Sequence, residues 1–212
     1  MADNVQKQLM IKSLPPFPID GTIVLKELNL NEILRLVERL LPQHVNEKIH
    51  IKLEMASMHL PVAADKTRMG DALVNLVQNA AEAMLDGGIL TLGTKLVTSQ
   101  DRPPFQTECC TAGACALISV ADNGVGMNPA IKKSMFEPYF TTKQGIHRGL
   151  GLPIAYSIIR KHNGCVKVES APGKGTTIKV YLPLLKGATR EEDPVLLPRS
   201  FFGEVYGEYR RC

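Results

Sequence analysis

The sequence lacks any apolar run of membrane-spanning length, because polar residues interrupt each hydrophobic stretch of its 212 residues. It also lacks a dense block of lysine and arginine, and its formal net charge is only +4, so no nucleic-acid partner is expected. The first residues, Met-Ala-Asp-Asn, have neither the basic region nor the apolar core of a signal peptide. These absences favour a cytoplasmic domain without a membrane segment.

Cysteine occurs without a recognisable motif. The five cysteines form no C-x-x-C pair, and an odd number argues against a closed disulfide framework. A redox or metal role for Cys109 and Cys110 stays open, although free thiols in a loop are the simpler interpretation. With 44% hydrophobic and 22% charged residues, the chain has the composition of a soluble globular domain with one core.

The order of patterned segments predicts a two-layer α+β sandwich, because strands and helices interleave without a regular strand–helix repeat. A lead-in or linker is expected over 1–20, one domain over 21–186 and a tail over 187–212. Asn31 is the expected cap of the first helix, and Ile51 is expected to face inward from an alternating strand. Helical spacing predicts helices over 31–41, 65–86, 129–134 and 150–162, and alternation predicts strands over 22–28, 48–55, 89–97, 114–121, 165–170 and 176–182.

The predicted helix over 65–86 has an unusual polar face. An ordinary solvated helix is one explanation, but asparagine is a poor helix former and stands twice in mid-helix, as Asn75 and Asn79. Two amide oxygens one turn apart can meet phosphates and a hydrated Mg²⁺ ion, which keeps most of its waters. On a helical wheel the polar face comprises Asp71, Asn75, Gln78, Asn79 and Glu82.

A first glycine motif occupies 122–127, with the sequence Asp-Asn-Gly-Val-Gly-Met. Its Asn-Gly pair alone predicts a tight hairpin turn. The second glycine, Gly126, and the Met127 that follows it exceed what a turn requires, because glycines allow the backbone to approach a ligand closely. The Asp122 carboxylate can accept a hydrogen bond from the exocyclic amine of a base. Together with the asparagine face, the motif favours a nucleotide pocket.

A second glycine motif, Gly149-Leu150-Gly151-Leu152, opens the predicted helix over 150–162. The start of a helix offers free amides and a positive dipole, which favour phosphate, and Lys143 and Arg148 add charge nearby. We expect the segment 136–148 to form a lid over the phosphates. The alternative is a flexible surface loop whose basic residues are simply solvated.

Taken together, these motifs resemble the boxes of bacterial sensor histidine kinases. The segment 75–80 is similar to their asparagine box, 136–143 to their phenylalanine box, and 122–127, 149–152 and 173–177 to their three glycine boxes. The resemblance runs from about Asn29 to Pro183 and is nearest to nitrogen-regulation-type kinases. It implies the catalytic ATP-binding domain of such a kinase, in the superfamily shared with gyrase, heat-shock chaperone and mismatch-repair ATPases. The implied Bergerat-type fold has helices on one face of a mixed, mainly antiparallel sheet.

The resemblance also implies ATP and Mg²⁺ as ligands. Asn79 would be the magnesium-associated residue, Asn75 its neighbour on the phosphate side, and Asp122 the partner of the adenine amino group. The implied nucleotide-binding residues are Asn75, Asn79, Glu82, Asp122, Gly124, Gly126, Met127, Thr142, Lys143, Arg148, Gly149, Leu150, Gly151, Leu152 and Thr177.

Two alternatives to a kinase stay open. An ATP hydrolase of the gyrase or heat-shock type carries a glutamate, as base for water, one turn before the magnesium asparagine. Here that position is Asn75, whose amide cannot take a proton at neutral pH, so the kinase interpretation is favoured. The third interpretation is a regulatory nucleotide-binding module without transfer activity.

No certain catalytic residue is present, because a histidine kinase needs a phosphoacceptor histidine that is normally followed by an acidic residue. None of the five histidines has an acidic successor, and the sequence before Asn29 is too short for the helical hairpin that would carry the acceptor. We therefore expect a monomer that binds ATP without phosphorylating itself. Its expected partners are a separate histidine-bearing dimerisation domain and a response regulator, whether it is free in the cytoplasm or the cytoplasmic part of a membrane sensor. For His162, which belongs to no motif, a surface or capping role is expected.

Overall fold

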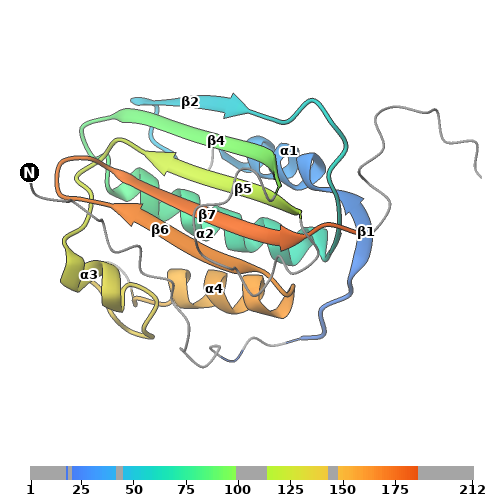
Figure 1. The fold of residues 1–212 in the computed structure, drawn as a ribbon. Helices are drawn as coiled ribbons and strands as arrows, with labels where there is room; N and C mark the ends of the chain where they lie inside the picture. Colours follow the sequence, from blue (N-terminus) through green and yellow to red (C-terminus); the bar gives the residue numbers. More distant parts are fainter. Residues whose placement is uncertain (1–17, 19–20, 42–44, 99–113, 143–147, 186–212) are drawn as a thin grey trace, which may run out of the picture.

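The computed structural model describes residues 18, 21–41, 45–98, 114–142 and 148–185. Over these residues the chain forms two layers, a five-stranded sheet and the helices that cover one of its faces (Figure 1). The predicted fold class is therefore confirmed. The elements are β1 (Lys26–Asn29), α1 (Leu30–Leu40), β2 (Ile49–Glu54), β3 (Pro61–Ala64), α2 (Lys66–Glu82), β4 (Gly88–Val97), β5 (Cys115–Asp122), α3 (Pro129–Ser134), α4 (Gly151–Lys161), β6 (Cys165–Ser170) and β7 (Thr176–Pro183).

The sheet is mixed and mainly antiparallel, with the strand order β2-β4-β5-β7-β6. Only β2 and β4 run parallel; the other neighbouring pairs are antiparallel. The register places Thr176 opposite both Asp122 on β5 and Ser170 on β6. Three polar residues from three strands therefore meet at one end of the sheet.

The core lies between the sheet and the helices. Because side chains alternate across a strand, every second residue of β4, β5 and β7 points at the helical layer. In that layer α2 packs against both α1 and α4 (Figure 1). Removal of this apolar surface from water is the main driving force for the fold. Typical buried residues are Leu73, Leu76, Val77, Leu90, Leu92, Ile118, Val120, Ile158, Ile159, Ile178 and Val180.

The start of α1 differs from the prediction. The cap is Asn29 and not Asn31: the Asn29 side chain accepts the Asn31 N–H at 3.1 Å. The Leu30 N–H is already bound by the Leu60 carbonyl oxygen at 2.9 Å. The helix can therefore begin earlier than predicted, because its first donors find partners within the fold.

The first strands also differ from the prediction. Ile51 is 41% exposed because β2 is an edge strand, which within the described residues pairs only with β4. The strand β3 was not predicted, since it has only four residues and begins with proline. It pairs antiparallel with β1 in a separate two-stranded sheet. Because the two strands are far apart in the chain, their pairing produces no pattern in the local sequence from which β3 could be predicted.

The cysteines require a correction. Cys115 and Cys165 are disulfide-bonded in the structure, contrary to the inference from the odd cysteine count. Cys109 and Cys110 lie outside the described residues, as do the expected linker and tail apart from residue 18. In the part of the chain that the structure describes, no helix has the length and apolarity needed to cross a membrane.

Candidate functional site

A cavity of about 500 Å³ opens between α2, α4 and the segments that carry the glycine motifs. Its size lies within the roughly 300–1,000 Å³ typical of small-molecule sites. Residues predicted for nucleotide binding from four separate segments meet at its walls. Those that line it are Asn75, Asn79, Glu82, Gly126, Met127, Thr142, Arg148, Gly149, Leu150, Gly151 and Leu152.

The asparagines face the cavity because two features fix the position of α2: a cap at its N-terminus and the packing of its apolar face in the core. The Asp65 carboxylate caps the helix by accepting the N–H groups of Thr67 and Arg68, each at 3.1 Å. The opposite face packs into the core, which leaves Asn75 and Asn79 toward the cavity. Their amide oxygens, with the nearby Glu82 carboxylate, form a set of hard oxygen donors. This donor set fits a Mg²⁺ ion that keeps several of its waters and contacts bound phosphates.

Asp122 lies at the end of β5, opposite the lining residue Thr176 on β7, and is not itself among the lining residues. One carboxylate oxygen, Oδ1, accepts two backbone N–H groups, from Gly124 at 2.9 Å and from Thr176 at 3.2 Å. Burial raises the pKa of the Asp122 carboxyl, and these two hydrogen bonds partly oppose that rise. Oδ1 is therefore occupied by the fold, and Oδ2 takes no part in these two bonds.

The first glycine loop, residues 123–127, fits closely against its neighbours. Val125 donates its N–H to the Ala83 carbonyl oxygen at 3.1 Å and accepts the Gly173 N–H at 2.8 Å. A Cβ at Gly126 would collide with the Ala171 carbonyl oxygen, and the residue has φ +66°. The close contact between the two backbones therefore requires a glycine at position 126, whether or not a ligand also approaches it.

The start of α4 forms the opposite wall. The helix begins at Gly151, and no side chain caps its first turn. Its free N–H groups and the positive end of its dipole therefore face the cavity, beside the exposed Arg148. Gly149 accepts the Tyr139 N–H at 3.1 Å, which ties the two sides of this wall together. Lys143 and the rest of the predicted lid from 143 to 147 lie outside the described residues.

The structure also brings residues to the cavity that sequence reasoning missed. Thr176 lines the wall, whereas the predicted Thr177 does not. Successive residues of β7 point to opposite faces, and Thr176 shares its face with the buried Ile178 and Val180. That alternation could have identified Thr176 from the sequence. The apolar lining includes Ile131 and Met135, which belonged to no motif, and Phe140, which lies in the segment similar to the phenylalanine box but was not named as a binding residue.

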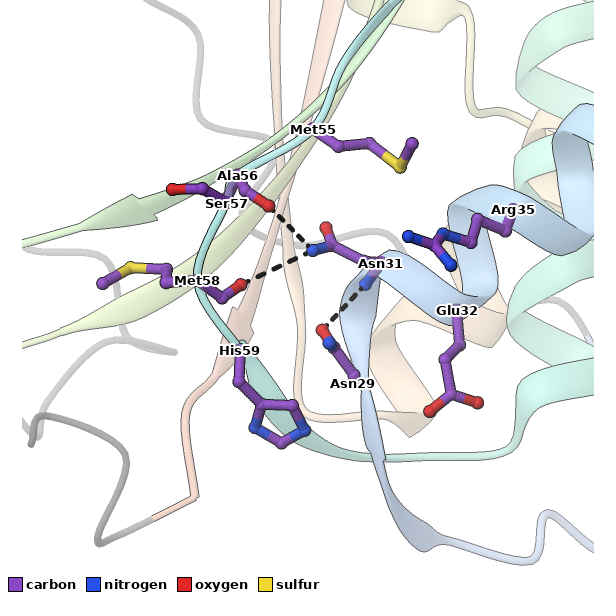
Figure 2. A pocket seen from close by; sticks show the side chains of 9 residues that line it. All are labelled: Asn29, Asn31, Glu32, Arg35, Met55, Ala56, Ser57, Met58 and His59. Carbon is purple, nitrogen blue, oxygen red and sulfur yellow. Dashed lines mark hydrogen bonds between the residues drawn. The ribbon is translucent and has the colours of Figure 1, made fainter. Parts of the chain in front are cut away.

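A second cavity, of about 540 Å³, lies where the start of α1 meets the β2–β3 connection (Figure 2). It contains none of the residues predicted for nucleotide binding. The Asn31 amide donates to the carbonyl oxygens of Ala56, at 2.9 Å, and Met58, at 3.5 Å, while its oxygen accepts the Thr94 hydroxyl. These bonds tie α1 to the connection and to β4, which is a structural role.

Comparison with known proteins agrees with this site. The family described as "Histidine kinase-, DNA gyrase B-, and HSP90-like ATPase" matches residues 64–186. The sensor kinase CckA of Brucella abortus (strain 2308) is 32% identical over 185 residues, which cover 87% of this chain and 20% of CckA. The catalytic domain of histidine kinase ThkA superposes with a TM-score of 0.60 at 30% identity, covering 76% of this chain and 95% of that domain.

A further solved structure holds ThkA in complex with the response regulator protein TrrA. That match has a TM-score of 0.58 at 28% identity and covers 77% of this chain and 42% of the ThkA chain. The curated kinases similar to this chain are longer: it spans 20% of CckA, 38% of sporulation kinase C of Bacillus subtilis (strain 168), and 44% of the kinase/phosphatase NtrB of Vibrio alginolyticus.

The fold and the cavity define an ATP-binding domain of the Bergerat type. The chain belongs to the histidine kinase-, DNA gyrase B- and HSP90-like ATPase family, within which it is an ATP-binding catalytic domain of the sensor histidine kinase kind.

Proposed function

We propose that this chain binds MgATP in the cavity between α2 and α4 and presents the γ-phosphate to a histidine on a separate dimerisation domain. The observation that carries the proposal is the cavity itself, which gathers an oxygen-rich helix face, a glycine loop beside the half-buried Asp122 carboxylate, and an uncapped helix start. Phosphoryl transfer depends mainly on positioning and charge neutralisation, and such a cavity suits both.

The two ends of the cavity differ in chemistry, which gives the nucleotide a direction. We assign the base to the end formed by Met127 and Thr176, in front of Asp122. The triphosphate then points toward the α4 amides and Arg148, where positive charge gathers. Bound Mg²⁺ would neutralise phosphate charge there. Asn79 is assigned as its ligand, with Asn75 beside it on the phosphate side.

The proposed protein partners are a histidine-bearing dimerisation domain and a response regulator. The complex of ThkA with its response regulator supports the second of these. The first follows from the histidines, since none of the five precedes an acidic residue. The proposed domain limits, 21–186 with a linker before and a tail after, place the complete nucleotide site within one unit.

The position of Asn75 separates this proposal from an ATP hydrolase. Asn75 lies on the cavity wall, one helical turn before Asn79, where a hydrolase of the gyrase type would place its glutamate base. An amide cannot accept a proton at neutral pH. We therefore propose transfer to a protein acceptor and only slow hydrolysis by water.

Titration calorimetry with ATP and with adenosine, in Mg²⁺ and in chelator, tests the proposal. Asn79→Ala should weaken MgATP binding by roughly tenfold or more, as loss of a metal-supporting residue does, and leave adenosine affinity unchanged. The matched control is Asp71→Ala, an exposed position on the same helix outside the cavity lining. Equal losses for both ligands would show that the substitution acts on the helix and not on the phosphate site.

A further inference from the structure

Ser170 joins two loops that lie 43 residues apart in the sequence. Its Oγ accepts the Met127 N–H of the first glycine loop at 2.8 Å. The same oxygen lies 3.0 Å from the Gly175 carbonyl oxygen and 3.0 Å from the Thr176 hydroxyl oxygen, both at the end of the β6–β7 connection. Ser170 does not line the cavity, but Met127 and Thr176 both do.

The chemistry of these contacts determines where each hydroxyl proton goes. Ser170 has one O–H and two lone pairs, and the Met127 N–H uses one lone pair. The Gly175 carbonyl oxygen can only accept, so the Ser170 proton must point to it. The second lone pair of Ser170 then accepts the Thr176 proton. Thr176, a lining residue of the cavity, is therefore left with lone pairs only, so its hydroxyl can act there only as an acceptor.

We propose that Ser170 is a positioning residue for base selectivity, which holds the Thr176 hydroxyl as a hydrogen-bond acceptor toward the base. The inference rests on the proposed ATP function and deepens it. Asp122 pairs with Thr176 in the β5–β7 register, so its carboxylate lies beside that hydroxyl. Its Oδ1 is occupied by two N–H groups, and we assign Oδ2 as the second acceptor for the base.

Two acceptors side by side discriminate between purines. Adenine carries a donor amino group at C6, whereas guanine carries a carbonyl oxygen there, which two acceptors repel. Without the Ser170 hydroxyl, the Thr176 proton is released and can turn toward the cavity, where it can donate to the guanine carbonyl. Ser170 thus acts on the base through Thr176 and does not touch the ligand.

Calorimetric dissociation constants for ATP and GTP, measured with the whole chain, test this role. Ser170→Ala should reduce the preference for ATP over GTP about fivefold, the typical effect of one net hydrogen bond. Ser170→Thr, which keeps the hydroxyl, should restore the preference. Ser119→Ala is the matched control, because Ser119 lies on β5 with its side chain on the sheet face opposite the helices. Thermal unfolding of each variant shows whether the fold is intact.

A structural role alone would lower the affinities for ATP and GTP by the same factor, and that result overturns the inference. If Ser170→Ala does not fold, Thr176→Val decides the question: it removes the acceptor with little change of volume, and an unchanged ATP preference overturns the inference. If the parent chain binds no ATP, both the proposed function and the role of Ser170 are overturned. If the parent binds ATP, and Ser170→Ala and Thr176→Val keep its preference for ATP over GTP, only the role of Ser170 is overturned.

Discussion

At the scale of single residues, we propose that Asp122 serves the fold and the ligand with different oxygens. Its Oδ1 holds the glycine loop and the start of β7 through the N–H groups of Gly124 and Thr176. Its Oδ2 takes no part in these two bonds and is the oxygen that we propose for the base. Because burial raises the pKa of this carboxyl, it takes up a proton at a higher pH than an exposed aspartate would.

The first prediction concerns Asp122→Asn. The amide oxygen of asparagine can still accept both backbone N–H groups, so the fold should persist, but the charged acceptor for the adenine amine is lost. We expect ATP affinity to fall by about 1.5–3 kcal/mol, the value of a hydrogen bond to a charged group. Calorimetry should also show that ATP affinity of the parent falls as the pH drops through the Asp122 pKa, while the variant shows no such step. Asp71→Asn is the control, and an equal affinity of the parent for ATP and GTP would contradict the assignment.

His162 is a second residue with a defined protonation state. It forms the C-cap of α4 and is only 2% exposed. Its Nε2 accepts the Asp65 N–H at 3.0 Å, so its Nδ1 carries the proton and donates to the Ile158 carbonyl oxygen at 2.8 Å. The neutral ring thus joins the end of α4 to the start of α2, and the expected capping role is the one that the structure shows.

The second prediction follows from the His162 pKa, which burial lowers in spite of the Ile158 bond and the Asp65 charge. Since the folded pKa lies below the unfolded value, the unfolded chain binds more protons, and stability from this group is lost as the pH falls below about 6.5. Urea unfolding between pH 7 and pH 5 should show this decline in the parent and a weaker decline in His162→Gln. His50→Gln, on the exposed edge strand β2, should keep the slope of the parent. Identical slopes in all three proteins would exclude His162 as the titrating group.

At the scale of elements, the site depends on how closely the first glycine loop and the β6–β7 connection fit together. Gly126 faces the Ala171 carbonyl oxygen with no room for a Cβ, and Gly173 donates its N–H to Val125. Both glycines have positive φ, at +66° and +69°, but an added Cβ at Gly173 would meet no heavy atom within 4 Å apart from Gly173 itself and its two chain neighbours. A side chain at Gly173 would therefore introduce backbone strain alone, whereas a side chain at Gly126 would introduce the same strain and a steric collision.

The third prediction compares alanine at these positions. Gly173→Ala should cost about 1–2 kcal/mol of stability, the strain of a left-handed residue, and should retain ATP binding. Gly126→Ala adds a collision with backbone that cannot move aside, so we expect a larger loss of stability and loss of ATP binding. Urea unfolding and calorimetry measure both effects. Equal effects at the two positions would show that contact between the loops does not shape the site.

At the scale of the whole molecule, the chain contains a nucleotide site but no histidine in the setting of a phosphoacceptor. His162 is a buried cap, and His50 and His59 precede Ile51 and Leu60. The remaining histidines, His44 and His147, precede Val45 and Arg148. The acidic neighbour that would serve as base is therefore missing as well.

The fourth prediction is that the isolated chain is a monomer that binds ATP but takes up no phosphate. Incubation with radiolabelled ATP should leave it unlabelled, and a histidine-bearing dimerisation domain, supplied in trans or by fusion, should become labelled. Asn79→Ala should abolish that transfer. Acid-labile, base-stable label on this chain alone would reveal an acceptor that the sequence pattern does not indicate, and sedimentation analysis checks the monomer.

The sequence by itself determined the features that follow from local pattern. The 3.6-residue spacing of α2 placed its asparagines opposite the apolar face, and alternation identified β4, β5, β6 and β7, because periodicity records which side of an element is buried. The glycine motifs indicated a nucleotide pocket because free amides and small residues are required where phosphates and backbone come close.

Only the tertiary structure decided which residues from separate segments meet. It brought Thr176 and not Thr177 to the cavity, left Asp122 out of the cavity lining, and assigned the cap of α1 to Asn29. The same holds for β3 and for the exposed Ile51, which depend on strand pairing between distant segments. Register, edge position and the direction of a hydroxyl proton are relations between segments, and for that reason no local pattern encodes them.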